Sequence, residues 1–334
     1  MHKVTYLLGA GASCNALPMA KGFAERLSRF NDDVLLPAVT KAYGTPGLPF
    51  PQEYFLWPRG SFAKEFAESL DWLGKEARRH ASIDTYAKKL FIRNDKEAQG
   101  LLNKLKSTLS CYLLLEQSLN PIDKRYDSFF ASILTRKPAG IPLLPEAVNI
   151  VTWNFDTQLE KSYKEFCENF AFVHEGITTA RNIIRLNGVC GLPHRIETRD
   201  LCHTDFSKSF FESVLKLFKD HMDSAIGCGP GISFAWEKDD SVAKITEMIK
   251  ETTTLIIVGY SLPYFNRGID RALFEIMAPT LEKIFIQVPE SVHPGVQERF
   301  LTLCKDKSLK EIIRKKFEML AGTDLFYIPD NMPG

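Results

Sequence analysis

The sequence lacks the features that mark several specialised classes of protein. Its seven cysteines are scattered and include no C-x-x-C pair, which argues against a disulfide framework and against a structural zinc site. No apolar run approaches the roughly 20 residues that span a bilayer. The N-terminal segment has neither the long apolar region nor the small-residue cleavage site of a signal peptide. We therefore expect a cytoplasmic protein with no bound metal and no membrane contact.

An excess of one charge is also missing. The 42 Lys and Arg residues nearly balance the 41 Asp and Glu residues, which gives a net charge of +1. This balance provides no broad attraction to nucleic acid, so we expect no direct nucleic-acid partner. Apolar residues make up 45% of the 334 residues and charged residues 25%, as in an ordinary globular protein. The length predicts one large domain with an insertion, or two smaller lobes.

Short apolar runs of the kind found in buried strands alternate with segments of helical periodicity. This alternation predicts an α/β fold with a Rossmann-like parallel sheet covered by helices on both faces. Helices are expected from about 157 to 169 and, as a basic amphipathic helix, over 308–317. The expected strands are Val4–Leu8, Ala147–Thr152, Ile183–Leu186, Thr254–Val258, Ile284–Val288 and Leu325–Ile328.

One long stretch interrupts the alternation. From Phe62 to about Leu134 the apolar residues repeat at helical spacing and strand patterns are absent. We therefore expect an inserted helical lobe over 45–144, and a Rossmann-like domain over 1–44 and 145–334. The stretch 45–60 is rich in Pro, Gly and aromatic residues. We therefore expect a loop whose apolar surface is covered by contact with another part of the protein or with a partner.

The first motif is the glycine turn Gly9-Ala10-Gly11-Ala12-Ser13, which lies directly after a strand and shortly before a helix. Glycines there let backbone N–H groups approach a pyrophosphate, and the helix dipole favours its negative charge. Cys14 stands where a third glycine of the dinucleotide fingerprint would be. A plain tight connection is the alternative interpretation.

Three further motifs follow strands. Thr152-Trp153-Asn154-Phe155-Asp156 brings an amide and a carboxylate to a strand end, where open parallel sheets bind ligands, although Asn and Asp also suit a helix N-cap. Leu186-Asn187-Gly188 is either part of a site or a simple Asn-Gly turn. Gly259-Tyr260-Ser261-Leu262-Pro263 offers a glycine and a hydroxyl to a phosphate or ribose, or merely connects a strand to a helix.

Taken in order, the four motifs resemble those of the SIR2-like family. The sirtuin glycine motif is similar to Gly9–Ser13 with the following Leu17-Pro18, and the family's T-x-N-[YIF]-D is similar to 152–156. Its L-H-G resembles 186–188, and the G-Y-S-L-P of bacterial SIR2-like proteins stands at 259–263. The resemblance covers roughly 3–30 and 145–290. It implies an extended NAD cleft whose residues are Gly9, Ala10, Gly11, Ala12, Ser13, Thr152, Asn154, Asp156, Gly259, Tyr260 and Ser261.

The resemblance also implies an activity. Asn154 would contact the nicotinamide ribose and help to position water, and Asp156 would hold the nicotinamide carboxamide. True sirtuins are deacylases with a zinc module, and the C-x-x-C pairs of that module are absent here. The combination resembles the NAD-hydrolysing SIR2-like effectors of bacterial antiphage systems. NAD is then the substrate, and a regulatory protein partner or homo-oligomer is expected because an uncontrolled NADase would poison its host.

One departure from the family pattern bears on catalysis. The family's catalytic histidine falls at Asn187, which cannot act as a general base, and losing such a base typically costs ~10²–10⁴-fold in rate. Asn187 and Asn154 together could hold the attacking water, or His174 or His194 could supply the imidazole. Alternatively the chain binds NAD or ADP-ribose without turnover. A protein deacylase is a third functional hypothesis.

Overall fold

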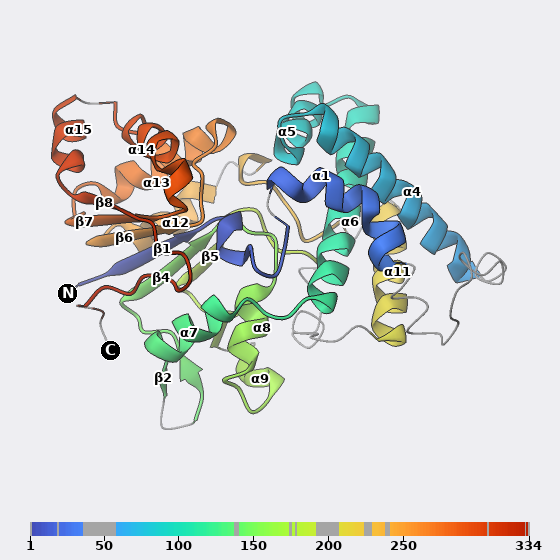
Figure 1. Cartoon of the computed structure of the whole chain (residues 1–334), viewed down its shortest axis with the longest axis horizontal. Helices are drawn as coiled ribbons and strands as arrows, with labels where there is room; N and C mark the ends of the chain where they lie inside the picture. The colour runs from blue at the N-terminus through green and yellow to red at the C-terminus, as the bar shows by residue number, and fades with distance from the viewer. Residues whose placement is uncertain are drawn as a thin grey trace.

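The fold is α/β, with a six-stranded parallel sheet flanked by helices, as the sequence predicted (Figure 1). The structure is a computed structural model. It describes residues 2–18, 20–35, 58–136, 140–173, 176–177, 179–191, 207–223, 229–237, 241–305, 307–330 and 332.

The sheet has the strand order β5-β4-β1-β6-β7-β8, and all neighbouring pairs are parallel. The chain builds outward from β1 through β4 to β5 and then returns to the other side of β1 with β6. The order therefore reverses at β1, which is where open α/β sheets bind ligands. The strands are β1 (Val4–Leu8), β4 (Val148–Thr152), β5 (Ile183–Arg185), β6 (Thr254–Val258), β7 (Lys283–Gln287) and β8 (Phe317–Leu320).

The central strands form because they are apolar and covered on both faces. Every residue of β1, β4 and β6 is buried. Tyr6 and Leu8 belong to a core with α7 (Lys124–Ile133) and α8 (Gln158–Lys164), whereas Leu7 belongs to the opposite core. That second core is covered by α12 (Ser241–Ile249), α13 (Arg267–Met277) and α14 (His293–Leu301).

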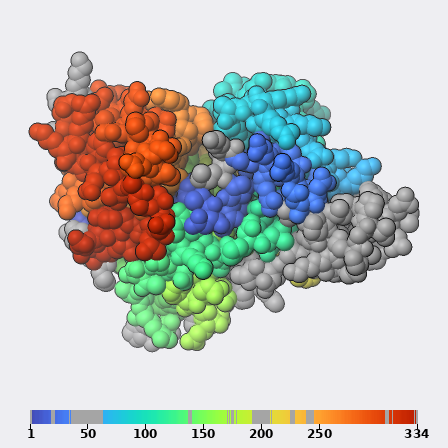
Figure 2. Space-filling view, in the orientation of Figure 1, coloured from blue at the N-terminus to red at the C-terminus, as the bar shows by residue number. Residues whose placement is uncertain are grey.

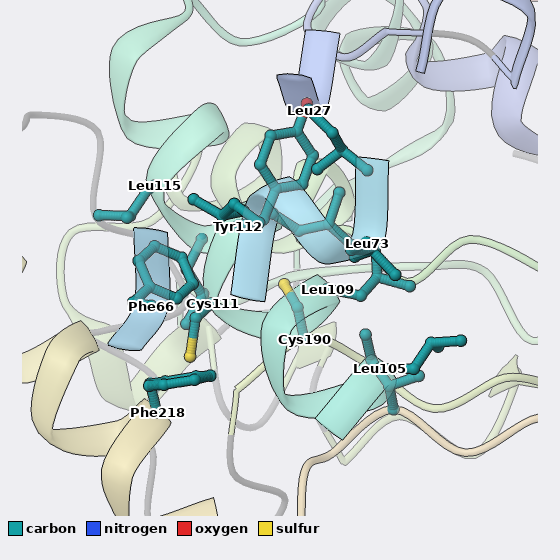
Figure 3. Packing of buried hydrophobic residues seen from close by; sticks show 14 of the residues in the cluster. Leu27, Phe66, Leu73, Leu105, Leu109, Cys111, Tyr112, Leu115, Cys190 and Phe218 are labelled. Atoms are coloured by element: carbon teal, nitrogen blue, oxygen red, sulfur yellow. The ribbon is translucent and has the colours of Figure 1, made fainter. Parts of the chain in front are cut away.

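A third core lies in a helical lobe beside the sheet. Its central side chains include Phe66, Leu109, Tyr112 and Phe218, which are buried together (Figure 3). In the space-filling view the lobe, blue and cyan, stands next to the orange and red C-terminal helices (Figure 2). The lobe helices are α1 (Ala20–Arg29), α4 (Pro58–Arg79), α5 (Ile83–Arg93), α6 (Lys96–Leu119) and α11 (Lys208–Met222).

The packing runs across the expected domain boundaries. Helices α1 and α11 both pack against α4, so residues on either side of the predicted 45–144 insertion contribute to the lobe. Conversely, α7 packs against α8 under the sheet. The division of the chain into two folding units stays a prediction. Helix α4 begins at Pro58, and 45–57 of the expected docking loop lies outside the described residues.

Three expected elements differ from the structure. The strand predicted over Leu325–Ile328 is wrong, because the last strand is β8, which pairs with β7. Phe326 is instead buried against the rings of Tyr126 and Phe129, so the apolar character of its segment reflects packing in the core and not pairing in the sheet. The basic helix ends at Arg314 because β8 begins at Phe317.

The third difference concerns α8. It ends at Lys164 and not near 169, since Glu165, Phe166 and Cys167 make i→i−3 bonds that tighten the last turn. No helix within the described ranges combines the length and the hydropathy that crossing a membrane requires.

His221 supplies a test of the lobe. It lies in α11 with 2% of its surface exposed, and its ring nitrogens have no hydrogen-bond partner among the described residues. Burial lowers the pKa of His221 to about 4, below its ordinary 6.5. The unfolded chain therefore takes up the proton first, so this group's stabilising contribution is complete above about pH 6.5 and is lost as the pH falls toward 4.

We expect His221→Phe to remove this pH dependence. The difference in the free energy of unfolding between the variant and the wild type should shift in favour of the variant as the pH falls from 7 to 5. Urea denaturation at several pH values measures it. A difference that does not change with pH would contradict the buried neutral imidazole.

Candidate functional site

A cavity of about 560 Å³ lies at the carboxyl ends of the central strands, between the sheet and the helical lobe. Its volume is within the usual range for small-molecule sites. The sheet side is contributed by the turns after β1, β4, β5 and β6. The lobe side comes from the α1, α4, α5 and α6 region and includes Phe23, Ala24, Ala77, Ala81, Ser82, Ile83, Asp84, Thr85, Leu109 and Leu113.

The strand register brings the four sequence motifs together. Leu8 of β1 is level with Thr152 of β4 and with Val258 of β6, so the three strands end at the same edge. The expected residues that line the cavity are Ala10, Asn154, Asp156, Asn187, Gly259, Tyr260 and Ser261. Those that do not line it are Gly9, Gly11, Ala12, Ser13 and Thr152, which lie next to it.

The glycine turn packs directly on the turn after β6. The Gly9 and Gly11 N–H groups donate to Val258 O at 3.0 Å and to Gly259 O at 2.8 Å. A Cβ at Gly11 would lie 2.7 Å from the Gly259 Cα, so the two turns meet backbone to backbone. These glycines therefore serve the contact between strands, and Ala10, which is exposed, is the member of the turn that faces the cavity.

An arginine from α7 holds the other side of the glycine turn. The Arg125 guanidinium donates to the carbonyls of Gly11 and Ala12, each at 3.1 Å, and is paired with Asp123 at 2.5 Å. The Arg125 and Asp123 side chains are 5% and 0% exposed. Asp123 also accepts from the backbone N–H of Asn15. This clamp fixes the two carbonyls of the glycine turn, and no motif in the sequence pointed to it.

Asn154 is held in place from the glycine turn. Its Nδ2 donates to the Ser13 Oγ at 3.3 Å, and that hydroxyl lies 3.0 Å from the Tyr126 hydroxyl. The Asn154 N–H donates to Thr152 Oγ1. Ser13 and Thr152 are thus buried supports for an amide that lines the cavity.

Asp156 precedes the N-cap of α8, which is Thr157 and has no side-chain cap, so Asp156 is not the N-cap that its sequence position allowed. Its Oδ1 accepts from the Gln158 N–H at 3.0 Å, a bond between residues i and i+2 that fixes the carboxylate before the helix. The side chain also lines the cavity while being only 6% exposed. Burial raises the pKa of the Asp156 carboxyl, and the bonds from Gln158 and Ser13 partly offset this.

Asn187 is tied to the backbone at both ends of its amide. Its Nδ2 donates to Trp153 O at 2.9 Å, and its Oδ1 accepts from the Ala235 N–H at 3.0 Å. The residue lines the cavity and is 5% exposed. An amide satisfies these two groups at once because it carries one donor end and one acceptor end. The predicted Asn-Gly turn is also present, with Gly188 at φ +70°.

A buried polar cluster supports the turn after β6. The Tyr260 ring stacks on Trp153 at 5.6 Å, and its hydroxyl donates to Asp270. Asn266 Nδ2 donates to the same hydroxyl at 3.0 Å. Burial raises the pKa of Asp270 to about 8, with the Tyr260 and Trp153 side chains working against the shift. Tyr260 is therefore a fixed wall of the cavity.

Two charged residues of the cavity were missed by the sequence analysis. Asp84 stands in the first turn of α5, and burial raises the pKa of its carboxyl to about 6. Arg299 reaches the cavity from α14 and donates through Nε to Ser261 O at 2.6 Å. Both come from elements far from the motifs in sequence, so only the folded chain brings them to the site.

The structure does not test the histidines that were candidates for a base. His174 and His194 lie outside the described residues. The described histidines do not line the cavity; they are His2, His80, His221 and His293. Within the described ranges no group of three or more His, Cys, Asp or Glu side chains is arranged to hold a metal ion.

No protein-family model matches this sequence, and no curated protein matches it. The likeness to the SIR2-like family therefore rests on the four motifs themselves.

Removing the Arg125 clamp should destabilise the protein. Arg125→Met leaves Asp123 as a buried charge without its partner, which typically costs about 3–5 kcal/mol. Arg125→Lys keeps the charge but loses the fork that reaches two carbonyls, so it should cost less. Chemical denaturation measures both, and the double change Asp123→Asn/Arg125→Met should recover part of the loss. Equal stability of Arg125→Met and the wild type would contradict the clamp.

Asp270 should make stability fall with rising pH. Its pKa is about 8 in the folded protein against an ordinary 3.8, so the folded state holds a proton that the unfolded chain has released. This contribution is complete below about pH 4 and is lost as the pH rises to 8. Asp270→Asn removes this contribution. Between pH 5 and 8 the free energy of unfolding of the variant should therefore rise relative to that of the wild type by up to about 1.4 kcal/mol per pH unit. Thermal unfolding of both proteins across this pH range tests the prediction. If the stabilities of the variant and the wild type change with pH in parallel, the prediction is refuted.

Proposed function

We propose that this protein is an NAD⁺ glycohydrolase that produces nicotinamide and ADP-ribose. The observation that carries the proposal is the convergence of all four SIR2-like motif regions on one cavity at the point where the strand order reverses. Ligands of open α/β sheets bind at this place. The order of the motifs along the sequence also resembles that of NAD-hydrolysing members of that family, and this resemblance supports NAD as the substrate.

The side chains around the β4 and β5 ends fit this reaction. Hydrolysis breaks the bond between the nicotinamide nitrogen and the ribose C1′, and the electron pair returns to the ring, which leaves as a neutral molecule. Water then bonds to C1′ and releases a proton. Asn154 and Asn187 bring amides that can orient this water, and the Asp156 carboxyl can bind the carboxamide. The cation that develops on the ribose needs a positioned water more than a strong base.

The distribution of polar and apolar residues around the cavity also supports a dinucleotide ligand. Its sheet side carries the polar side chains of Asn154, Asp156, Asn187 and Ser261, whereas much of its lobe side is apolar. Arg299 is the cation among the described lining residues, and it can meet a phosphate near the β6 turn. The N–H groups of Gly9 and Gly11 are already bonded, so phosphate contacts from the glycine turn fall mainly to Ala10.

A second candidate function is a sensor that binds NAD or ADP-ribose without turnover. The observation that favours it is the Asn187 amide, whose two ends are held by Trp153 and Ala235 and which has no imidazole chemistry. The two candidates differ only in whether bound NAD is cleaved. In either case we propose control by a protein partner or by self-assembly, since free NAD hydrolysis would harm the cell.

Release of nicotinamide from NAD at high enzyme concentration tests the main proposal. Asn154→Ala should lower the rate about 10²-fold or more, since it removes a positioned group of the reaction. Asp127→Asn is the matched control, because Asp127 is exposed on α7 and does not line the cavity; its rate should equal that of the wild type.

Calorimetry with ADP-ribose separates the outcomes. Binding without nicotinamide release, even at high enzyme concentration and with cell extract added as a source of partner, would favour the sensor. Neither binding nor release would reject both functions.

A further inference from the structure

Among the described residues, the lobe side of the cavity carries one carboxylate, that of Asp84. Helix α5 begins after Ser82, whose Oγ accepts the Thr85 N–H at 3.1 Å, and this cap fixes the first turn that holds Asp84. Asp84 lines the lobe side of the same cavity whose sheet side includes Tyr260 and Ser261 of the β6 turn. Asp84 therefore faces the sheet from the opposite wall.

No protein group among the described residues neutralises this carboxylate. Asp84 makes no ion pair and accepts no side-chain hydrogen bond there, and the preceding residue Ile83 is apolar and buried. The carboxylate accepts a hydrogen bond from its own backbone N–H, and its half-buried position removes part of its hydration. Its free lone pairs are then available to a ligand.

The position of Asp84 selects one end of the ligand. Asn187 follows β5, and β6 is three strands away, which corresponds to about 14 Å at the usual strand spacing. If nicotinamide lies near Asp156 and Asn187, the β6 turn faces the adenosine half of an extended dinucleotide. A carboxylate accepts bonds from both hydroxyls of a ribose and repels a phosphate on either of them.

We propose that Asp84 accepts hydrogen bonds from the adenosine ribose hydroxyls and thereby makes the site prefer NAD over its 2′-phosphorylated form, NADP. This inference rests on the proposed function. The acidic residue that performs this task in ordinary dinucleotide-binding sheets follows a strand of the sheet. Here the acidic residue comes from the helical lobe. The strand ends would bind the nicotinamide half of NAD, and the lobe would bind the adenosine ribose.

The test measures binding of ADP-ribose and of ADP-ribose 2′-phosphate by calorimetry, so that NAD cleavage does not interfere. The wild type should bind ADP-ribose at least tenfold more tightly than its 2′-phosphate. Asp84→Asn should weaken ADP-ribose binding about tenfold and reduce the preference to within about threefold, because charge-assisted hydrogen bonds and phosphate repulsion are both lost.

Two variants guard against trivial outcomes. Asp84→Glu keeps the charge and should keep the preference, and Asp127→Asn, on the exposed face of α7, should behave as the wild type. If Asp84→Asn retains the wild-type preference while the wild type cleaves NAD, this inference fails and the proposed function stands. If the wild type binds neither ligand and releases no nicotinamide, both fail.

Discussion

The contact between the turns that follow β1 and β6 is the constraint on which the cavity depends. Gly259 has φ +59°, and a Cβ there would lie 2.3 Å from the Ala12 nitrogen, so a side chain at this position would force the two strand ends apart. With both turns joined by backbone hydrogen bonds, the positions of Ala10, Tyr260 and Ser261 are set by the main chain. Asn154 is then anchored to the same unit through Ser13.

Much of the fold was predictable because its strands are short, apolar and buried on both faces. Val4–Leu8 and Thr254–Val258 have the bounds that the sequence predicted, and β4, β5 and β7 differ by a residue at their ends. The parallel order then places all four motifs at one edge. The strand predicted over Leu325–Ile328 is wrong for a related reason. An apolar run indicates that a segment is buried, and Phe326 is buried without belonging to the sheet.

The parts of the site that escaped prediction depend on contacts between distant segments. Arg125 lies 113 residues or more from the carbonyls that it holds, and nothing in its local sequence reveals them. Asp84 and Arg299 approach the cavity from helices with ordinary patterns. Asn187 was found, but its two backbone partners were not, because the segment containing Ala235 pairs with its turn only in the folded chain.

The walls of the cavity belong to two hydrophobic cores, since Leu109 and Leu113 are part of the lobe core and Trp153 and Tyr260 are part of the sheet core under α12, α13 and α14. Ala77, Ala81 and Asp84 line the lobe wall, whereas the strand end that carries Asn154 and Asp156 is joined to the lobe core through Phe155. A lobe wall of this kind can change its residues one at a time while the strand ends keep Asn154 and Asp156 in place.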